Sequence, residues 1–246
     1  MAIEDNRRFY YSHFMVLPRS LLLLLPLLQA APVYAEVAGY FTASTNYLWR
    51  GVTQTGDKPA VSAAVEYHAE QGSYLGVWAS NIDYGDRTSV EVDTYLGHRF
   101  DLYGVGVELA VRNYCFPSGG KYNYDFRPDK WEDRDSSNFT ELQAGVTYAG
   151  LNGRYSYSNS YLDSGERGYY IELNYTHTFT NALSLHLHIG SQGSRAIDDT
   201  QYTVSDQSAT LKWGNFFFTA SDMCDNEDGR QSDHARYLAG WSVEVR

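Results

Sequence analysis

The feature that most constrains the fold is a strict alternation of apolar and polar residues, repeated along most of the chain. From Leu183 to Ile189, leucine and isoleucine occupy the odd positions, and serine and histidine occupy the even ones. Segments 169–179 and 105–112 alternate in the same way. Successive side chains of a β-strand point to opposite faces, so each segment predicts a strand with one apolar and one polar face.

About twelve such segments follow residue 35, an even number, as bacterial outer-membrane barrels have. Short turns between them alternate with longer polar connections, a pattern typical of transmembrane β-barrels with short periplasmic turns and long outer loops. The chain therefore predicts an all-β, antiparallel transmembrane β-barrel with both termini on the periplasmic side. The expected strands are 37–49, 60–69, 73–82, 89–99, 104–115, 138–148, 152–160, 168–179, 183–191, 204–213, 215–223 and 235–245.

A soluble β-sandwich or lipocalin-like barrel would also alternate with period two, but its apolar face would point inward. The mean hydropathy of −0.44 does not decide between the two, because a membrane barrel needs apolar residues only at every second strand position. Strand number, loop rhythm and aromatic residues near strand ends favour the membrane. These aromatic residues are Tyr47, Trp49, Tyr114, Phe116, Tyr148, Tyr161, Phe179, Trp213 and Trp241.

The first 35 residues are predicted to be a cleaved signal peptide. Arg19 precedes the apolar run Leu21–Leu28, and small residues follow up to Ala35, after which we expect cleavage. The apolar run is far shorter than the roughly 20 residues that a membrane-spanning helix needs. The barrel domain is then residues 36–246, and either Met1 or Met15 is the true start.

Four motifs in the first half of the chain resemble the TorF family of porins. They are Asn46–Thr55 (NYLWRGVTQT), Lys58–Val61 (KPAV), Tyr74–Asp83 (YLGVWASNID) and Glu91–Gly97 (EVDTYLG), within roughly residues 37–117. The resemblance implies an outer-membrane location and a porin function with no settled substrate, and it brings no catalytic or binding residues. The chain departs from such barrels at its end, which is Val-Glu-Val-Arg and not an aromatic residue.

If the apolar faces contact lipid, the charged residues of the strands must face the lumen, because Arg or Lys at the bilayer midplane costs about 2–4 kcal/mol. A twelve-strand barrel has a narrow bore. We therefore expect a channel for passive diffusion of small solutes or ions, with a salt-bridged, plugged barrel as the alternative. The predicted pore-lining residues are Arg50, Glu66, His68, Glu91, Asp93, Arg99, Glu108, Arg112, Glu141, Arg154, Glu172, His186, His188 and Lys212.

Metal sites are weaker hypotheses. His186 and His188 share one strand face and could bind zinc if a third ligand were present, but hydrated lumen residues are the more ordinary interpretation. The acidic stretches Asp125–Asp135 and Asp222–Asp233 could hold calcium, although their spacing matches no EF-hand loop. We expect no metal and no cofactor.

An enzymatic function is the alternative from a different class. Some twelve-strand outer-membrane barrels are phospholipases with a Ser-His pair on the lipid-facing wall. His177, and with less support His98, falls on the apolar face, but no G-x-S-x-G motif and no convincing serine partner is present, so no enzyme is expected. Cys115 and Cys224 could pair or remain free thiols.

The expected partners are outer-membrane lipid, lipopolysaccharide and small solutes or ions, in the outer membrane of a Gram-negative bacterium. The formal net charge of −11 argues against nucleic acid as a partner, because phosphate binding needs clustered Lys and Arg. The sequence leaves open which solute is transported, the ion selectivity, whether the lumen is open, and the oligomeric state.

Overall fold

The structure is a computed structural model, which describes residues 35–85, 88–117, 138–194, 202–225 and 235–246. The predicted signal peptide, both candidate start residues, the stretch Asp125–Asp135 and most of Asp222–Asp233 lie outside the described residues. Among the described residues, no helix is long and apolar enough to cross a membrane.

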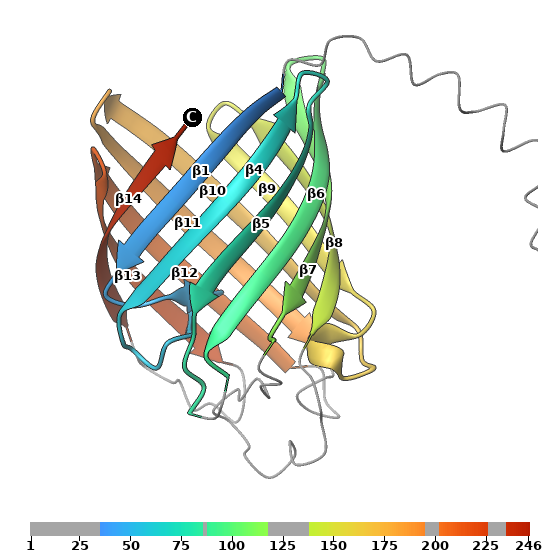
Figure 1. The fold of residues 1–246 in the computed structure, drawn as a ribbon, viewed down its shortest axis with the longest axis vertical. Coiled ribbons are helices and arrows are strands. Elements are labelled where there is room, and N and C mark those ends of the chain that lie inside the picture. Colours follow the sequence, from blue (N-terminus) through green and yellow to red (C-terminus); the bar gives the residue numbers. More distant parts are fainter. Residues whose placement is uncertain (1–34, 86–87, 118–137, 195–201, 226–234) are drawn as a thin grey trace, which may run out of the picture. The chain divides into compact units, whose positions relative to one another are not determined.

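The described residues form a closed antiparallel β-barrel of twelve strands, as predicted (Figure 1). Every barrel strand pairs with its neighbours along the chain, and β1 pairs with β14 to close the ring. The barrel strands are β1 (Ala35–Ser44), β4 (Ala60–Ala69), β5 (Ser73–Asn81), β6 (Val90–Leu102), β7 (Val105–Cys115), β8 (Phe139–Tyr148), β9 (Leu151–Ser158), β10 (Gly168–Thr180), β11 (Leu183–Ser194), β12 (Tyr202–Trp213), β13 (Phe216–Asp225) and β14 (Arg236–Val245).

The start of β1 and the end of β14 lie at the same end of the barrel, because Gly39 is paired with Val245 and Ser44 with Gly240. The short turns join the strands at that end, and the strand ends that the longer connections join lie at the other. The first and last strands of the barrel thus begin and end, respectively, at one end of the ring. Which side of the membrane this end faces stays a prediction.

The expected first strand, 37–49, is wrong at its C-terminal end, since β1 stops at Ser44. Asn46 redirects the chain here: its amide nitrogen donates to Asp57 Oδ1 at 2.8 Å, and its amide oxygen accepts from Thr53 Oγ1 at 2.7 Å. Residues 48–49 form β2 (Leu48–Trp49), which pairs with β3 (Val52–Thr53) in a separate small hairpin. The remaining strand boundaries agree with the prediction to within three residues.

The orientation of the two strand faces is as predicted. Apolar side chains such as Val65, Leu96, Ile171 and Ile189 point outward and are more than half exposed. The alternate positions of the same strands carry polar and charged side chains that are largely buried inside the ring. The soluble alternative, with apolar rows packed inside, is therefore wrong for this chain.

Eight of the nine aromatic residues predicted for the two membrane interfaces divide into two groups, and the ninth, Trp241, packs edge-on against Phe41. At the short-turn end, Tyr148, Phe179 and Trp213 are exposed on the outer face, and Trp213 is 70% exposed. The prediction of an aromatic membrane interface is wrong at the other end, because five aromatic residues there point into the barrel. Tyr114, Phe116 and Tyr161 belong to a buried cluster in the barrel mouth, and Tyr47 and Trp49 pack against it.

Among the described residues, the sulfur of Cys115 is a free thiol. Cys115 ends β7 and Cys224 lies on β13, and these strands are not neighbours in the ring. Of the two possibilities that the sequence left open, the structure therefore has no Cys115–Cys224 disulfide.

Candidate functional site

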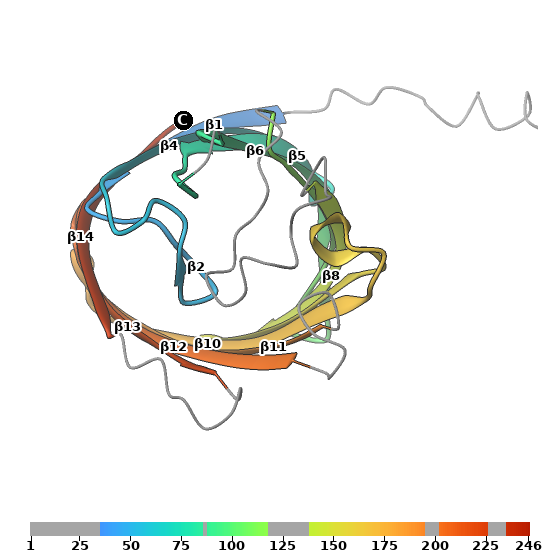
Figure 2. The ribbon, with the colours of Figure 1, turned by 90° about the horizontal axis from the view of Figure 1, so that it is seen from below.

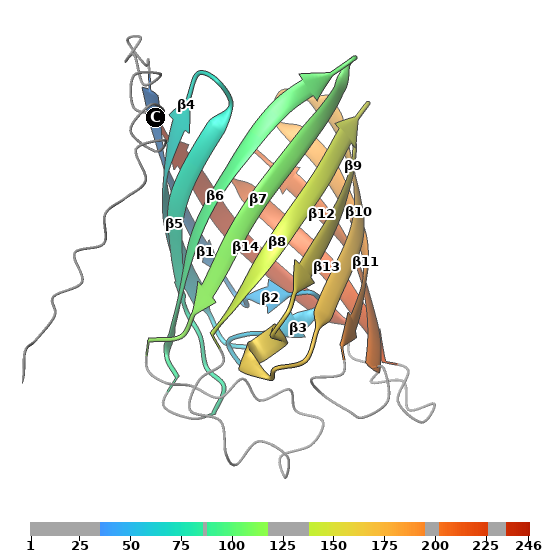
Figure 3. The ribbon, with the colours of Figure 1, turned by 90° about the vertical axis from the view of Figure 1, so that its right-hand side faces the viewer.

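The β2–β3 hairpin lies inside the barrel, near the end that carries the longer connections (Figures 2 and 3). Its turn consists of Arg50 and Gly51, which have φ angles of 50° and 78°. Two positive φ angles make this the tight type I′ turn of two-residue hairpins, and a glycine at the second position suits it. A Cβ on Gly51 would lie 2.9 Å from the Cβ of Asp206, so the tip of the hairpin approaches the far wall.

Arg50 connects this tip to the opposite wall of the barrel. Its Nη2 atom donates to both carboxylate oxygens of Glu141 on β8, at 2.7 and 3.0 Å. Its Nη1 atom donates to Gln192 Oε1 on β11 at 3.2 Å, and the guanidinium lies 4.2 Å from the ring centroid of Tyr170 on β10. The side chains of Arg50 and Glu141 are 6% and 2% exposed, so this ion pair is buried. Arg50 therefore faces the lumen as predicted, but from an inserted loop and not from the barrel wall.

Aromatic packing supports the same hairpin. Trp49 contacts Tyr114 edge-on, with ring centroids 5.7 Å apart, and stacks on Tyr161 at 6.4 Å. Phe139 stacks on Tyr114 at 4.4 Å and meets Tyr161 edge-on at 5.1 Å. Such pairs contribute about 0.5–1.5 kcal/mol each beyond their burial. Together they close one side of the barrel mouth.

An exposed ion pair between Lys58 and Asp83 links the inserted segment, residues 45–59, to the β5–β6 connection. The Lys58 ammonium and the backbone N–H of Gly85 hold the pKa of the Asp83 carboxyl below its usual value. Because the pKa of Asp83 in the folded protein lies below the ordinary aspartate value of about 3.9, the stabilisation from this contact is fully present above that ordinary value. It is lost only as the pH falls through the lower pKa of the folded state. The link is therefore present at neutral pH.

Most of the other predicted lumen charges form ion pairs with one another along β6 to β11. Glu108 accepts from Arg99 at 2.7 Å and from Arg154 at 2.9 Å. Arg154 also lies 3.8 Å from Glu172 on the next strand. Arg99, Glu108 and Arg154 line a cavity of about 560 Å³ at the short-turn end.

The remaining predicted residues on this side also lie on the inner face. Arg112 donates to Asp93 at 3.0 Å, and Glu66 accepts from Tyr95 at 2.6 Å. Three more predicted residues differ in their surroundings. His68 lies 2.9 Å from Glu66, Glu91 is buried, and Lys212 on β12 is exposed near a short turn. The structure thus places the predicted residues inside the ring, while their role in lining a conducting pore stays a prediction.

His186 and His188 have separate partners. His188 Nε2 lies 2.8 Å from Asp206 Oδ2 and 2.9 Å from the Tyr170 hydroxyl, and its Nδ1 lies 2.7 Å from Asn174. His186 Nδ1 instead contacts the Thr176 hydroxyl at 3.0 Å. Within the described ranges, no three His, Cys, Asp or Glu side chains converge as metal ligands would.

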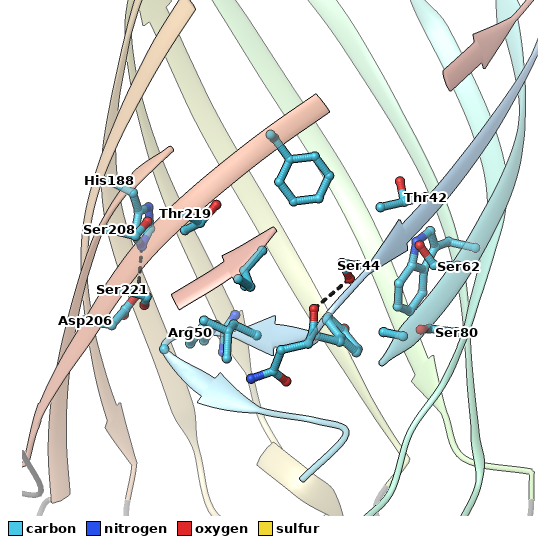
Figure 4. Close-up of a pocket in the computed structure, with 18 residues that line it drawn as sticks. Thr42, Ser44, Arg50, Ser62, Ser80, His188, Asp206, Ser208, Thr219 and Ser221 are labelled. Carbon is cyan, nitrogen blue, oxygen red and sulfur yellow. Dashed lines mark hydrogen bonds and ion pairs between the residues drawn. The ribbon is translucent and has the colours of Figure 1, made fainter. Parts of the chain in front are cut away.

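A cavity of about 380 Å³ remains inside the barrel beside the hairpin (Figure 4). Of the predicted pore-lining residues, only Arg50 and His188 border it. The rest of its lining comes from residues 46–48 and 51 of the inserted segment and from β12, β13, β14, β1, β4 and β5, and most of these strand residues are small and uncharged. These residues include Thr42, Ser44, Ser62, Trp78, Ser80, Asp206, Ser208, Phe217, Thr219 and Ser221.

The sequence reasoning missed these residues because it selected charges on the polar faces. The alternation itself could have found them: Thr42, Ser62 and Ser80 occupy the inward positions of three strands that are neighbours in the ring. Nothing in the sequence pattern indicated that the segment after Ser44 would enter the bore.

One serine–histidine contact is present on the outer face. Ser73 Oγ lies 3.0 Å from His98 Nδ1, and both residues are exposed near the short-turn end. Among the described residues, no carboxylate or amide is hydrogen-bonded to the other nitrogen of His98, although a catalytic histidine needs such an orienting group. His177 packs edge-on against Phe179, with ring centroids 4.6 Å apart. The geometry gives no support to a hydrolytic site.

A closed barrel with an apolar outer face spans a membrane, because the ring pairs every strand edge and places the charges inside. In bacteria, barrels of this type belong to the outer membrane.

Several solved structures resemble this fold. The COG4313 outer membrane channel from Pseudomonas putida F1 is 13% identical, with a TM-score of 0.46 over 87% of this chain and 96% of that chain. OccK8 (OprE) from Pseudomonas aeruginosa is 13% identical, with a TM-score of 0.40 over 83% of this chain and 62% of that chain. LpxR from Salmonella typhimurium is 10% identical, with a TM-score of 0.34 over 85% of this chain and 99% of that chain.

No curated protein sequence matches the chain. The family model described as "Bacterial protein of unknown function (Gcw_chp)" matches residues 30–237, which is most of the barrel. The chain therefore belongs to the Gcw_chp family.

Proposed function

We propose that the protein is an outer-membrane channel through which small solutes or ions diffuse passively. The observation that carries this proposal is the arrangement of the lumen. The inserted segment narrows the bore, yet it leaves a cavity of about 380 Å³ against the wall of small residues. A plugged structural barrel would instead need large side chains packed across the whole section.

The barrel size supports the proposal. Eight-stranded barrels are filled by side chains, and sixteen-stranded porins have an aqueous channel, so twelve strands leave room for a narrow path. The resemblance of residues 46–61 and 74–97 to the TorF porins points to the same function. In this proposal the protein has no catalytic role and no cofactor.

The proposed orientation has both termini in the periplasm and the longer connections outside the cell. Outer-membrane lipid and lipopolysaccharide then contact the apolar outer face, and the inserted segment lies nearer the outer mouth. Solutes entering from outside would meet the Arg50 hairpin first.

The direct test is the single-channel conductance of refolded protein in planar bilayers. We expect a small conductance for the native chain. Replacing residues 48–53 by a short Gly-Ser linker should increase the conductance several-fold, because the hairpin no longer occupies the bore. A matched control is Asn181→Gly in a short turn at the opposite end, which should conduct like the native chain.

The controls separate the alternatives. Heat-modifiable gel migration must show that each variant is folded as a barrel. If neither the native barrel nor the linker variant conducts, the protein is a plugged barrel and the proposal is wrong. Phospholipid hydrolysis that Ser73→Ala or His177→Ala abolishes would instead establish the enzymatic alternative.

A further inference from the structure

The wall of the 380 Å³ cavity carries a row of hydroxyl groups across neighbouring strands. Ser80 on β5 is paired in register with Ser62 on β4, and Ser62 with Thr42 on β1. Farther along the same wall, Ser208 on β12 is paired with Ser221 on β13. Figure 4 shows these side chains around the cavity, some on each side of it. Paired positions of neighbouring strands lie on the same face, so the hydroxyls form two polar patches, one on β5, β4 and β1 and one on β12 and β13, with Leu238 of β14 between them.

Four of the hydroxyls lack a hydrogen-bond partner within the described part of the chain. They are Thr42, Ser62, Ser208 and Ser221, whereas Ser80 donates to Val61 O at 3.2 Å. Ser221 is only 7% exposed, so its hydroxyl is buried from bulk solvent and open only to the cavity. A buried hydroxyl without a partner costs free energy, so Ser221 needs water or a ligand in the cavity, and the half-buried Thr42, Ser62 and Ser208 are free to bind the same occupant.

The charged groups at the edge of the cavity already have partners. Arg50 is ion-paired with Glu141, and the Asp206 carboxylate is hydrogen-bonded to the Tyr170 hydroxyl and to His188. An ion entering the cavity would lose hydration without gaining an unpaired counter-charge from these groups. The lining therefore favours a solute without net charge.

Three aromatic residues also line the cavity: Tyr47 of the inserted segment and two on the barrel wall. Trp78 lies on β5 and Phe217 on β13, with β4, β1 and β14 between them in the ring. A small-molecule site typically combines apolar or aromatic surface with a few polar groups that fix orientation, in a volume of about 300–1,000 Å³. The cavity has this composition and a volume in the lower part of this range.

We propose that the cavity is a binding site for an uncharged, polyhydroxylated solute, a sugar or polyol of monosaccharide to disaccharide size. Each serine or threonine hydroxyl both donates and accepts a hydrogen bond, as each hydroxyl of a sugar does. The C–H face of a sugar ring can pack on Trp78 or Phe217. The inference rests on the proposed channel function and names the class of solute that the channel passes.

The experiment measures glucose and maltose binding in two independent ways. In planar bilayers, the titrated sugar should interrupt the ion current, and the fractional block gives a Kd. In detergent, the same sugars should change the intrinsic tryptophan fluorescence of the folded barrel, and Trp78→Phe should reduce that change. Gluconate, which has a similar size and a negative charge, should bind at least tenfold more weakly than glucose.

The decisive variants remove hydroxyls without changing side-chain volume much. Ser221→Ala alone should raise the glucose Kd roughly two- to tenfold, as expected for one hydrogen bond to a neutral group. The combination with Thr42→Val, Ser62→Ala and Ser208→Ala should raise it well beyond tenfold. The matched control is Thr94→Val, which removes an outward-facing hydroxyl from β6 and should leave the Kd unchanged.

The outcomes distinguish this inference from the proposed function. If ions pass but glucose and maltose neither block the current nor change the fluorescence, the sugar site is wrong and the channel remains. If sugars bind by fluorescence but no ion current flows, the binding site stands and the channel function fails. An unchanged glucose Kd in the combined variant, or gluconate binding as tightly as glucose, would overturn the site.

Discussion

Replacing Arg50 by alanine should release the inner hairpin from the barrel wall and widen the path through the lumen. The guanidinium makes both of its shortest contacts with Glu141, at 2.7 and 3.0 Å, and the two side chains are 6% and 2% exposed. Removing it leaves the Glu141 carboxylate buried with Tyr114 and Gln143 as its neutral hydrogen-bond donors. In the docked state, the Glu141 carboxylate on β8 is then buried without a counter-charge.

The size of the effect follows from the burial of the pair. Removing one partner of a buried ion pair costs about 3–5 kcal/mol. Because about 1.4 kcal/mol corresponds to a factor of ten, the equilibrium between docked and released hairpin should shift by roughly two to four powers of ten. The remaining contacts of Trp49 contribute only about 0.5–1.5 kcal/mol per ring pair. The backbone pairing of β2 with β3 contributes little to the free energy of docking, since an isolated two-stranded hairpin is only marginally stable.

The assay is single-channel recording, with limited proteolysis of residues 45–59 as a second measurement. Arg50→Ala should give larger and noisier currents and faster cleavage than the native barrel. Arg50→Met combined with Glu141→Met is the matched control: it removes both charges, so the hairpin should dock again and the current should return toward the native value. Equal currents and equal cleavage rates for all three proteins would refute the claim that this pair holds the hairpin.

Two further predictions concern the barrel wall. Leu96→Arg, on the lipid-facing side in the middle of β6, should lower the free energy of unfolding in lipid vesicles by about 2–4 kcal/mol, measured by urea titration. The matched control is Tyr103→Arg, in a short turn where the side chain is 98% exposed, and it should lower the free energy of unfolding by at most about 1 kcal/mol. Equal losses of stability for the two variants would contradict the membrane orientation. Gly190→Ala should destabilise the barrel by about 1–3 kcal/mol, because the added Cβ would overlap the Tyr170 hydroxyl. In the control Gly106→Ala, the added Cβ would lie 3.6 Å from the nearest atom, the Cβ of Thr147, so this substitution should be tolerated. If the Gly190→Ala barrel were as stable as this control, the packing argument would be refuted.

The barrel could be predicted from the sequence because its signal is local. Alternation within a segment such as 183–189 fixes which side chains share a face, and the loop rhythm fixes how the strands connect. Once the apolar face is assigned to lipid, every inward residue follows, including the charges from Glu66 to Lys212. These features need no knowledge of which distant strands become neighbours.

The inner hairpin could not be predicted in the same way. Leu48, Trp49 and Val52 have the residue types of a strand end near a membrane interface. The polar run Ser44-Thr45-Asn46 interrupts the alternation before them, but such a run does not tell a turn into the bore from an ordinary loop. What turns the segment inward is a set of non-local contacts, chiefly Arg50 to Glu141, 91 residues away in the chain. A pattern within one segment carries no information about such a partner.

The asymmetry of the lumen has a related origin. The charged and aromatic inner surface comes from β6 to β11, which are consecutive in the chain. The surface of small hydroxyl residues comes from β12 to β14 together with β1, β4 and β5, the two ends of the barrel sequence, and these become one surface only when β1 pairs with β14. Thr42 and Ser221 border one cavity although 179 positions separate them. The closing strand pair therefore does more than complete the ring: it creates the open side of the lumen, and a weakened β1–β14 pairing would disrupt the cavity before it disrupted the ion pairs opposite.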